Sequence, residues 1–224
     1  MTRELDGALA ISGMGAVSAL GAGLGALREA LLAGRDGIRP VERFDTGGFT
    51  VSLGAEVPGW ADRRDSVLDG ADVRRSLCVE FGVRAAREAW AEARLDGDSI
   101  APGRVALVLG TSLGDHVDGM HSLAEAIADA LGIAGPRLTV STACASSTHA
   151  IGLGRDLVLG GFADVALAGG SDVLTPEIFA GFHALGLLSR AKCAPFSEPP
   201  GTTLGEGAGF VVLERAERAR ARGI

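Results

Sequence analysis

The sequence contains no tyrosine, and aromatic residues make up only 4% of its 224 residues. Few side chains are therefore available to stack on the bases of single-stranded nucleic acid. Cysteine is also scarce: Cys78, Cys144 and Cys193 form no Cys-x-x-Cys pair and have no histidine partner at zinc-site spacing. These absences argue against a disulfide framework and a structural metal site. They fit a protein of the reducing cytoplasm with no bound metal.

An excess of positive charge and long apolar runs are also missing. Lys and Arg number 21 against 28 Asp and Glu, which gives a formal net charge of −7. This balance disfavours a nucleic-acid binder or a polybasic membrane-surface protein. No apolar stretch reaches the ~18 residues that would suggest a membrane span. Two acids precede the first apolar run, so we expect neither export nor membrane insertion.

Apolar runs that alternate with helical patterns dominate the chain, which is typical of βαβ units feeding a largely parallel sheet. Hydrophobic residues make up 47% of the sequence, and the length suits one large domain or two small ones. The patterns predict strands over 8–13, 104–110, 137–141, 163–168 and 209–214, helices over 23–33, 72–94, 119–131, 144–159 and 215–223, and a short hairpin over 50–57.

Gly13-x-Gly15-x-x-Ser18 follows the first predicted strand and resembles a dinucleotide-binding fingerprint. In that fingerprint, glycines let the backbone approach a pyrophosphate at a helix N-terminus. The third glycine is missing here, and Asp36, the acidic residue nearest the expected spacing, lies in a loop rich in glycine and proline. We therefore interpret the glycines as part of a tight structural turn and expect no nucleotide cofactor.

Ser171 and the four histidines do not form a recognisable site. Ser171 lacks the Gly-x-Ser-x-Gly context of a nucleophile elbow and is interpreted as a polar residue at a strand end. His116 and His121 lie at a polar helix start with no third ligand nearby, which favours a solvated face over a metal site. His149 and His183 lie in separate segments.

The segment around Cys144 has the pattern of a reactive site. Residues 140–152 run from a β-branched strand through small residues into a predicted helix. This order places the Cys144 sulfur opposite free backbone N–H groups, where the helix dipole favours the nucleophilic thiolate. The small flanking residues let a substrate approach closely. Cys78, in an apolar helical stripe, and Cys193, in a loop, are interpreted as buried fillers.

The motif Thr142-Ala143-Cys144-Ala145-Ser146-Ser147 resembles the active-site cysteine motif of the β-ketoacyl synthases of fatty-acid and polyketide assembly. Further motifs that resemble the family follow in order along nearly the whole chain: Ile11–Ser18, Leu31–Ile38, Gly132–Pro136, Ala166–Ser171, Leu187–Ser189, Pro195–Ser197 and Leu204–Gly209. The resemblance is specific for the family and says little about the substrate.

The resemblance implies a thiolase-like α/β fold, in which two related halves form an α-β-α-β-α sandwich. Residues 1–224 would be the N-terminal, cysteine-bearing domain, with a mixed, largely parallel five-stranded sheet flanked by helices. In the family, the C-terminal half carries two histidines, a lysine and a glycine-rich turn of the oxyanion hole, and these have no counterpart here. None of the four histidines lies in the family's His-Gly-Thr or Gly-Gly-His contexts.

The function implied by the resemblance is transfer of an acyl group from a carrier-protein thioester to Cys144, whose backbone N–H would be one oxyanion donor. Condensation with malonyl carrier protein, which releases CO2, would need a partner chain or a missing half that supplies the histidines. The substrates would be carried on the phosphopantetheine of an acyl carrier protein, and no other cofactor is implied. A homo- or hetero-oligomer is expected.

Arg74 and Arg75 lie where related synthases present basic residues to an acidic carrier protein, with a solvated helix face as an equal alternative. The chain departs from the family between 111 and 132, where it is shorter, and over 196–201, where Ser and prolines replace an Asp and an Arg-Asp-Gly turn. A non-catalytic subunit that shapes chain length and a stand-alone acyltransferase are alternative functions. Chain-length subunits usually lack the nucleophilic cysteine, so Cys144 favours catalysis.

Overall fold

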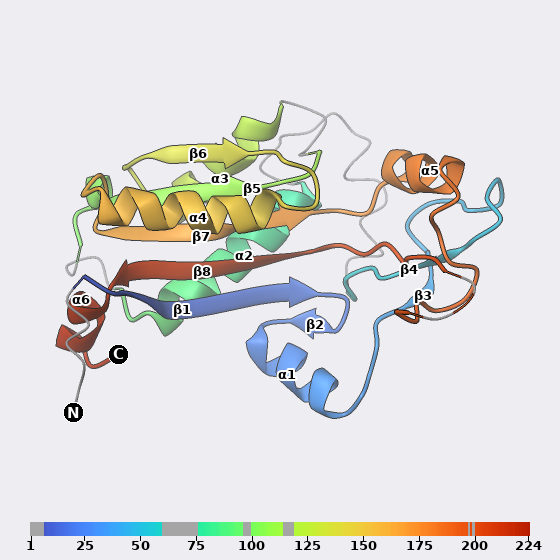
Figure 1. Cartoon of the computed structure of the whole chain (residues 1–224), viewed down its shortest axis with the longest axis horizontal. Helices are drawn as coiled ribbons and strands as arrows, with labels where there is room; N and C mark the ends of the chain where they lie inside the picture. The colour runs from blue at the N-terminus through green and yellow to red at the C-terminus, as the bar shows by residue number, and fades with distance from the viewer. Residues whose placement is uncertain (1–6, 60–75, 96–99, 114–118, 197, 199) are drawn as a thin grey trace.

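The computed structural model describes residues 7–59, 76–95, 100–113, 119–196, 198 and 200–224. In these ranges the elements (Figure 1) are β1 (Leu9–Ser18), β2 (Gly21–Ala22), α1 (Leu24–Leu32), β3 (Arg39–Pro40), β4 (Leu53–Gly54), α2 (Leu77–Glu92), the 3-10 helix η3 (Pro102–Arg104), β5 (Val105–Gly110), α3 (Met120–Leu131), β6 (Arg137–Val140), α4 (Ser146–Leu159), β7 (Val165–Asp172), α5 (Pro176–Ala184), β8 (Gly207–Arg215) and α6 (Ala216–Ala221).

The main sheet has the strand order β2-β1-β8-β7-β5-β6. The pairs β7–β5 and β5–β6 are parallel, whereas β2–β1, β1–β8 and β8–β7 are antiparallel. The expected mixed sheet flanked by helices is confirmed, and its five longer strands are extended at one edge by the two residues of β2. Parallel pairing is less dominant than expected, because β8 enters the middle of the sheet antiparallel to both neighbours.

Helices cover the two faces of this sheet. α2 and α3 pack on one face, and α4 lies along β5 and β7 on the other (Figure 1). The buried strand β5 serves both faces because its side chains alternate. Leu107 and Leu109 join the core beneath α2 and α3, whereas Ala106 and Val108 join the core beneath α4.

Gly13 and Gly15 lie within β1, so the interpretation of this motif as a tight turn is wrong. A Cβ added to Gly13 would come within 2.1 Å of the carbonyl oxygen of Ala89, and one added to Gly15 within 2.0 Å of that of Ala85. Both carbonyls belong to α2. The two glycines therefore let the backbone of the helix lie directly against the backbone of the strand.

Two carboxylates of α2 hydrogen-bond the edge of β1 that β2 leaves uncovered. Glu92 accepts a hydrogen bond from the Met14 N–H (2.5 Å), and Glu88 accepts one from the Ala16 N–H (3.0 Å). Glu88 also accepts from the N–H of Leu24 at the start of α1 (2.8 Å). The strand edge is thereby satisfied without a further strand.

The outer loops form a third apolar cluster beside β3, β4 and α5 (Figure 1), in which Phe44 and Phe49 pack edge-on against buried Phe179. An ion pair holds these loops to the sheet. The fully buried carboxylate of Glu206 accepts from both terminal nitrogens of Arg43 and from the backbone N–H groups of Val57 (2.9 Å) and Leu174 (3.0 Å).

Arg43 remains charged despite its burial. Burial acts to lower the pKa of Arg43, but the hydrogen bonds and charge of Glu206 outweigh it and raise that pKa above its ordinary value. The cost of desolvating the two charges is offset by the convergent donors around the carboxylate.

Most predicted elements are confirmed with shifted ends. The predicted strand 8–13 extends to Ser18, and the predicted hairpin is the pairing of β4 with β3 rather than a turn within 50–57. Of the predicted helix 72–94, residues 72–75 lie outside the described part, and α2 covers most of the rest. α5 was not predicted. None of the helices in the described ranges is both long and apolar enough to span a membrane.

Gly15→Ala should lower the free energy of unfolding by roughly 1–3 kcal/mol, the usual cost of overpacking a core, because the clashing atom belongs to the backbone of α2. Gly209→Ala on the neighbouring strand β8 is the matched control, since its added Cβ meets nothing within 4 Å. Urea unfolding followed by circular dichroism measures both. If both variants lowered the free energy of unfolding by the same amount, the packing role of Gly15 would be contradicted.

Candidate active site at Cys144

Cys144 lies in the turn that joins the end of β6 to the start of α4. β6 ends at Val140 and α4 begins at Ser146, so the structure agrees with the predicted strand-to-helix position of Cys144. Its side chain is exposed, whereas Cys78 is buried and Cys193 is intermediate. Cys144 is therefore the cysteine most open to a reagent or substrate.

Two glycines allow the first turn of α4 to seat on the sheet. A Cβ added to Gly110, at the end of β5, would lie 2.5 Å from the backbone of Ser146 and Ser147. One added to Gly170 in β7 would lie 2.1 Å from the Ser147 hydroxyl oxygen and 2.6 Å from the Gly110 carbonyl oxygen. The position of the Cys144 turn thus depends on the absence of side chains at the ends of two adjacent strands.

The backbone of the turn is unusual at Ala143, whose φ is +52°. An L-residue with a side chain loses roughly 1–2 kcal/mol in this left-handed region, so surrounding contacts must hold it. Buried Ser146 supplies them: its hydroxyl oxygen accepts from the Thr142 N–H (2.9 Å) and lies 2.6 Å from the Ala143 carbonyl oxygen and 3.1 Å from that of Thr111.

The neighbouring strand ends are held by Asp172. Its carboxylate accepts from the Thr111 hydroxyl (2.8 Å) and from the N–H (2.9 Å) and hydroxyl (3.1 Å) of Ser112. The Ser141 hydroxyl donates to the Ser112 carbonyl (3.1 Å), which connects this cluster to the Cys144 turn. These three hydrogen bonds make Asp172, at the end of β7, the link to the residues that follow β5.

His149 lies in the first turn of α4, and its Nδ1 is 2.7 Å from the Thr142 hydroxyl oxygen. Sequence reasoning placed His149 in a separate segment and missed this contact. Thr142 and His149 are seven residues apart, and only the turn between strand and helix brings them together. Two residues seven apart in a single helix lie on the same face, and the sequence would then have indicated the contact. Thr142 precedes the helix, so this rule does not apply to it.

The remaining predicted residues lie elsewhere. His121 contacts Thr139 and Glu125 on the outer side of α3 and β6, and His183 contacts Thr50. Ser171 is buried within β7 and donates to the carbonyl of Cys78 (2.7 Å), whose thiol in turn lies 3.2 Å from the Ser171 carbonyl oxygen. Cys78 is buried, as predicted. His116, Arg74 and Arg75 lie outside the described residues.

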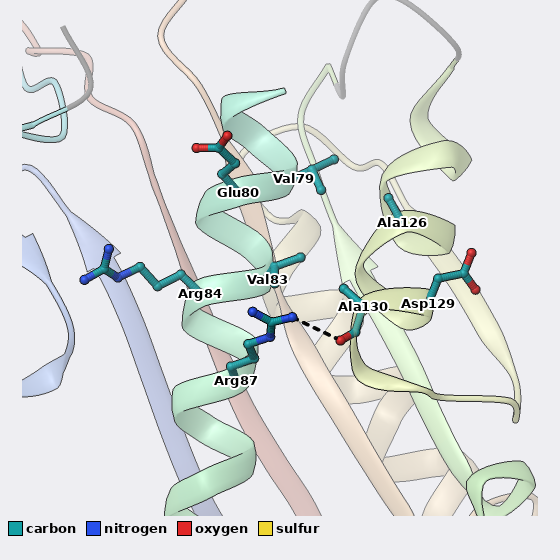
Figure 2. A pocket seen from close by; sticks show the side chains of 8 residues that line it. All are labelled: Val79, Glu80, Val83, Arg84, Arg87, Ala126, Asp129 and Ala130. Carbon is teal, nitrogen blue, oxygen red and sulfur yellow. Dashed lines mark hydrogen bonds between the residues drawn. The ribbon is translucent and has the colours of Figure 1, made fainter. Parts of the chain in front are cut away.

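A groove of about 760 Å³ lies between α2 and α3 (Figure 2). Val79, Val83, Ala126 and Ala130 give it apolar walls, and the Arg87 side chain crosses toward α3 to donate to the Ala130 carbonyl (3.4 Å). α2 and α3 cover the face of the sheet opposite to α4. The groove is therefore separate from Cys144 and adds nothing to its chemistry.

The arrangement at Cys144 suits a sulfur nucleophile. An exposed thiol stands two residues before the first residue of a helix of 14 residues, on a turn held by its own hydrogen bonds. Within the described ranges, no three His, Cys, Asp or Glu side chains are placed to hold a metal ion. The turn can therefore present the sulfur to an electrophile that arrives from solvent.

The family model described as "Beta-ketoacyl synthase, N-terminal domain" matches residues 7–126 and 120–219. The chain belongs to the beta-ketoacyl synthase family. The resemblance based on the sequence motifs is thereby confirmed, and the ketosynthase Cys144 motif falls within the second matched segment.

Curated ketosynthase relatives match almost the whole chain. A 3-oxoacyl-[acyl-carrier-protein] synthase 2 of Coxiella burnetii is 29% identical over 95% of this chain and 59% of its own length. The chloroplastic 3-oxoacyl-[acyl-carrier-protein] synthase I of Arabidopsis thaliana is 30% identical over 95% and 52%. Nodulation protein E of a Rhizobium species is 31% identical over 98% and 60%. The chain thus spans a little over half the length of these relatives.

Solved ketosynthases share the fold. The structure of the ishigamide ketosynthase/chain length factor matches with a TM-score of 0.85 and 31% identity, over 96% of this chain and 60% of the other. A beta-ketoacyl synthase from Burkholderia phymatum matches with a TM-score of 0.80 and 29% identity over the same shares. These neighbours confirm the thiolase-like α/β fold of one ketosynthase half.

Iodoacetamide near neutral pH should alkylate Cys144 before Cys193, and Cys78 last. The reason is the order of exposure combined with the helix N-terminus beside Cys144. Peptide mapping after limited reaction measures the three rates in one sample, and Cys144→Ala identifies the signal. Faster labelling of Cys193 or Cys78 would show that the turn does not activate Cys144.

Proposed function

We propose that this ketosynthase domain accepts an acyl group on Cys144 from a carrier-protein thioester, as the cysteine-bearing half of a condensing enzyme in fatty-acid or polyketide synthesis. The observation that carries the proposal is the exposed Cys144, held on a left-handed turn at the start of α4, in a chain of the beta-ketoacyl synthase family.

In the acyl-transfer step, the Cys144 thiolate attacks the thioester carbonyl and forms a carbon–sulfur bond. The carbonyl oxygen becomes an oxyanion, to which we propose that the Cys144 backbone N–H donates a hydrogen bond. Collapse of this intermediate breaks the bond to the phosphopantetheine sulfur, which leaves as a thiolate and takes up a proton. The acyl group is then held on Cys144 as a new thioester, and no further cofactor is required.

Condensation needs more than this chain offers. Loss of CO2 from a malonyl thioester builds an enolate, whose charge requires positioned donors such as neutral imidazoles. The described histidines are engaged elsewhere: His121 with Thr139 and Glu125, His149 with Thr142, and His183 with Thr50. A partner chain or a second half with its own histidines would supply these donors and complete the reaction.

An uncovered apolar face beside α4 supports a second half as partner. Gly13 and Gly15 face α2, so the alternation of β1 places Met14 on the face where α4 lies. Met14 is 45% exposed, and Leu153 on α4 is 41% exposed. A Cβ added to Gly152, also on α4, would meet no other atom within 4 Å. Such a face fits a second α/β half packed against α4.

An acyl carrier protein is the proposed donor of the acyl group. Arg74 and Arg75 precede α2 in the sequence, and basic residues there would attract the acidic surface of a carrier protein. A structure of a type II polyketide ketosynthase in complex with its acyl-carrier protein is among the neighbours by fold. The docking role of these two arginines is a proposal from charge and from family resemblance.

A non-catalytic subunit that shapes chain length is the second candidate. One structural neighbour is a ketosynthase/chain length factor pair, so the fold accommodates both roles. Cys144 separates them, because a subunit without turnover has no need of an exposed thiol on a strained turn.

The purified chain should take up an acyl group on Cys144 from an acyl thioester, while malonyl decarboxylation stays near background. In other enzymes, a single oxyanion donor contributes a factor of about 10²–10³ to the rate. Among the described residues, no histidine lies free to stabilise the enolate: His121, His149 and His183 each contact another side chain. Intact-protein mass spectrometry measures acylation, and release of labelled CO2 measures decarboxylation. Adding a chain that bears the C-terminal ketosynthase half should restore condensation.

Cys144→Ala with the same partner is the control and should form no acyl-enzyme. Robust condensation by the chain alone would contradict the need for a second half. Failure of Cys144 to become acylated with the partner present would favour the non-catalytic subunit.

The isolated chain should self-associate through the uncovered face beside α4. The double change Met14→Glu and Leu153→Glu places charge on that face and should shift the population toward monomer. Leu32→Glu is the control, because Leu32 on α1 is 77% exposed but lies outside this face. Light scattering reports the mass of each variant. A monodisperse wild-type monomer would argue against an incomplete surface.

A further inference from the structure

The Cys144 turn is held from two sides. On the buried side, the Ser146 hydroxyl contacts the backbone at Thr142 and Ala143. On the exposed side, the Thr142 hydroxyl contacts Nδ1 of His149 at 2.7 Å. Ser146 is 2% exposed and belongs to the core, whereas His149 reaches the turn across the surface of the helix.

His149 is itself fixed in the first turn of α4. Its backbone N–H donates to the carbonyl of Ala145 (3.0 Å), so the helix fixes the backbone from which the imidazole side chain extends. The ring then spans from α4 back to Thr142, and the strained Ala143 and the nucleophile Cys144 lie between these two anchor points. Loosening the Thr142 end would let the left-handed turn relax and carry the sulfur away from the helix N-terminus.

We propose that His149 is a positioning residue for Cys144, which it holds in place through the hydroxyl of Thr142. The proposal rests on the proposed function of Cys144 as the acylated nucleophile. The alternative, a direct proton transfer between His149 and Cys144, is less supported: within the described part of the chain, Cys144 Sγ makes no hydrogen bond to either ring nitrogen, and Nδ1 is engaged by Thr142.

The atoms involved give a sharp set of variants. His149→Ala removes the contact. His149→Asn places an amide atom as many bonds from Cβ as Nδ1 and should preserve it, whereas His149→Gln places its amide at the distance of Nε2 and should not. Thr142→Val removes the hydroxyl with little change of shape, and Thr142→Ser keeps the hydroxyl.

The readout is the rate at which iodoacetamide alkylates Cys144, divided by the rate at Cys193 in the same chain. His149→Ala and Thr142→Val should each lower this ratio roughly two- to tenfold, the range that corresponds to one neutral hydrogen bond. In the double variant the ratio should fall no further than in either single variant, because His149→Ala and Thr142→Val remove the same contact. His149→Asn and Thr142→Ser should stay near wild type, and His149→Gln should resemble His149→Ala.

Thermal unfolding separates positioning from a general loss of structure. Because His149 is exposed, its variants should keep a melting temperature near that of the wild type. A fall in melting temperature with faster alkylation of Cys193 and Cys78 would instead reveal a purely structural role and overturn the proposal.

Three other outcomes would also overturn it. Rescue by His149→Gln but not by His149→Asn would assign the effect to Nε2. A loss in His149→Ala with none in Thr142→Val would mean that the ring acts on the sulfur directly. An unchanged or faster alkylation of Cys144 in both His149→Ala and Thr142→Val would mean that the contact does not position Cys144. Alkylation needs no acyl substrate, so these results stand even if acyl transfer by Cys144 is disproved.

Discussion

The contact between the first turn of α4 and the ends of β5 and β7 is the constraint on which the site depends. Gly110 and Gly170 leave no room for a side chain beneath Ser146 and Ser147. Because the helix backbone rests directly on the sheet, the buried Ser146 can reach the turn and stabilise Ala143 at positive φ. Cys144 is exposed on the turn whose place is set by this close seating.

The sequence predicted the local elements well and the pairing of strands less well. The apolar run of β5 and the periodicity of α2 mark their structures without reference to the rest of the chain. The interpretation of Gly13-x-Gly15 as a turn was wrong because the pattern arises from contact with the backbone of α2, at least 70 positions away, which no local pattern records. The central, antiparallel place of β8 was not predicted for the same reason.

At the candidate site, the position of Cys144 between strand and helix could be predicted because strand, small residues and helix follow one another in the chain. The partner of Thr142 could not, since the contact with His149 depends on how sharply the turn reverses into α4. Glu206 shows the same limit: its motif marks the family, but its donors come from Arg43, Val57 and Leu174, which are scattered along the sequence.

The central place of β8 has a consequence for how the chain acquires its fold. β8 lies between β1 and β7, and its register pairs Leu9 with Arg215. During synthesis, β1 therefore lacks its main neighbour until β8 has left the ribosome, and the sheet closes through contacts of very large sequence separation. Such closure is slow compared with local folding. Until β8 is in place, the facing edges of β1 and β7 are unpaired, and exposed strand edges of this kind favour aggregation.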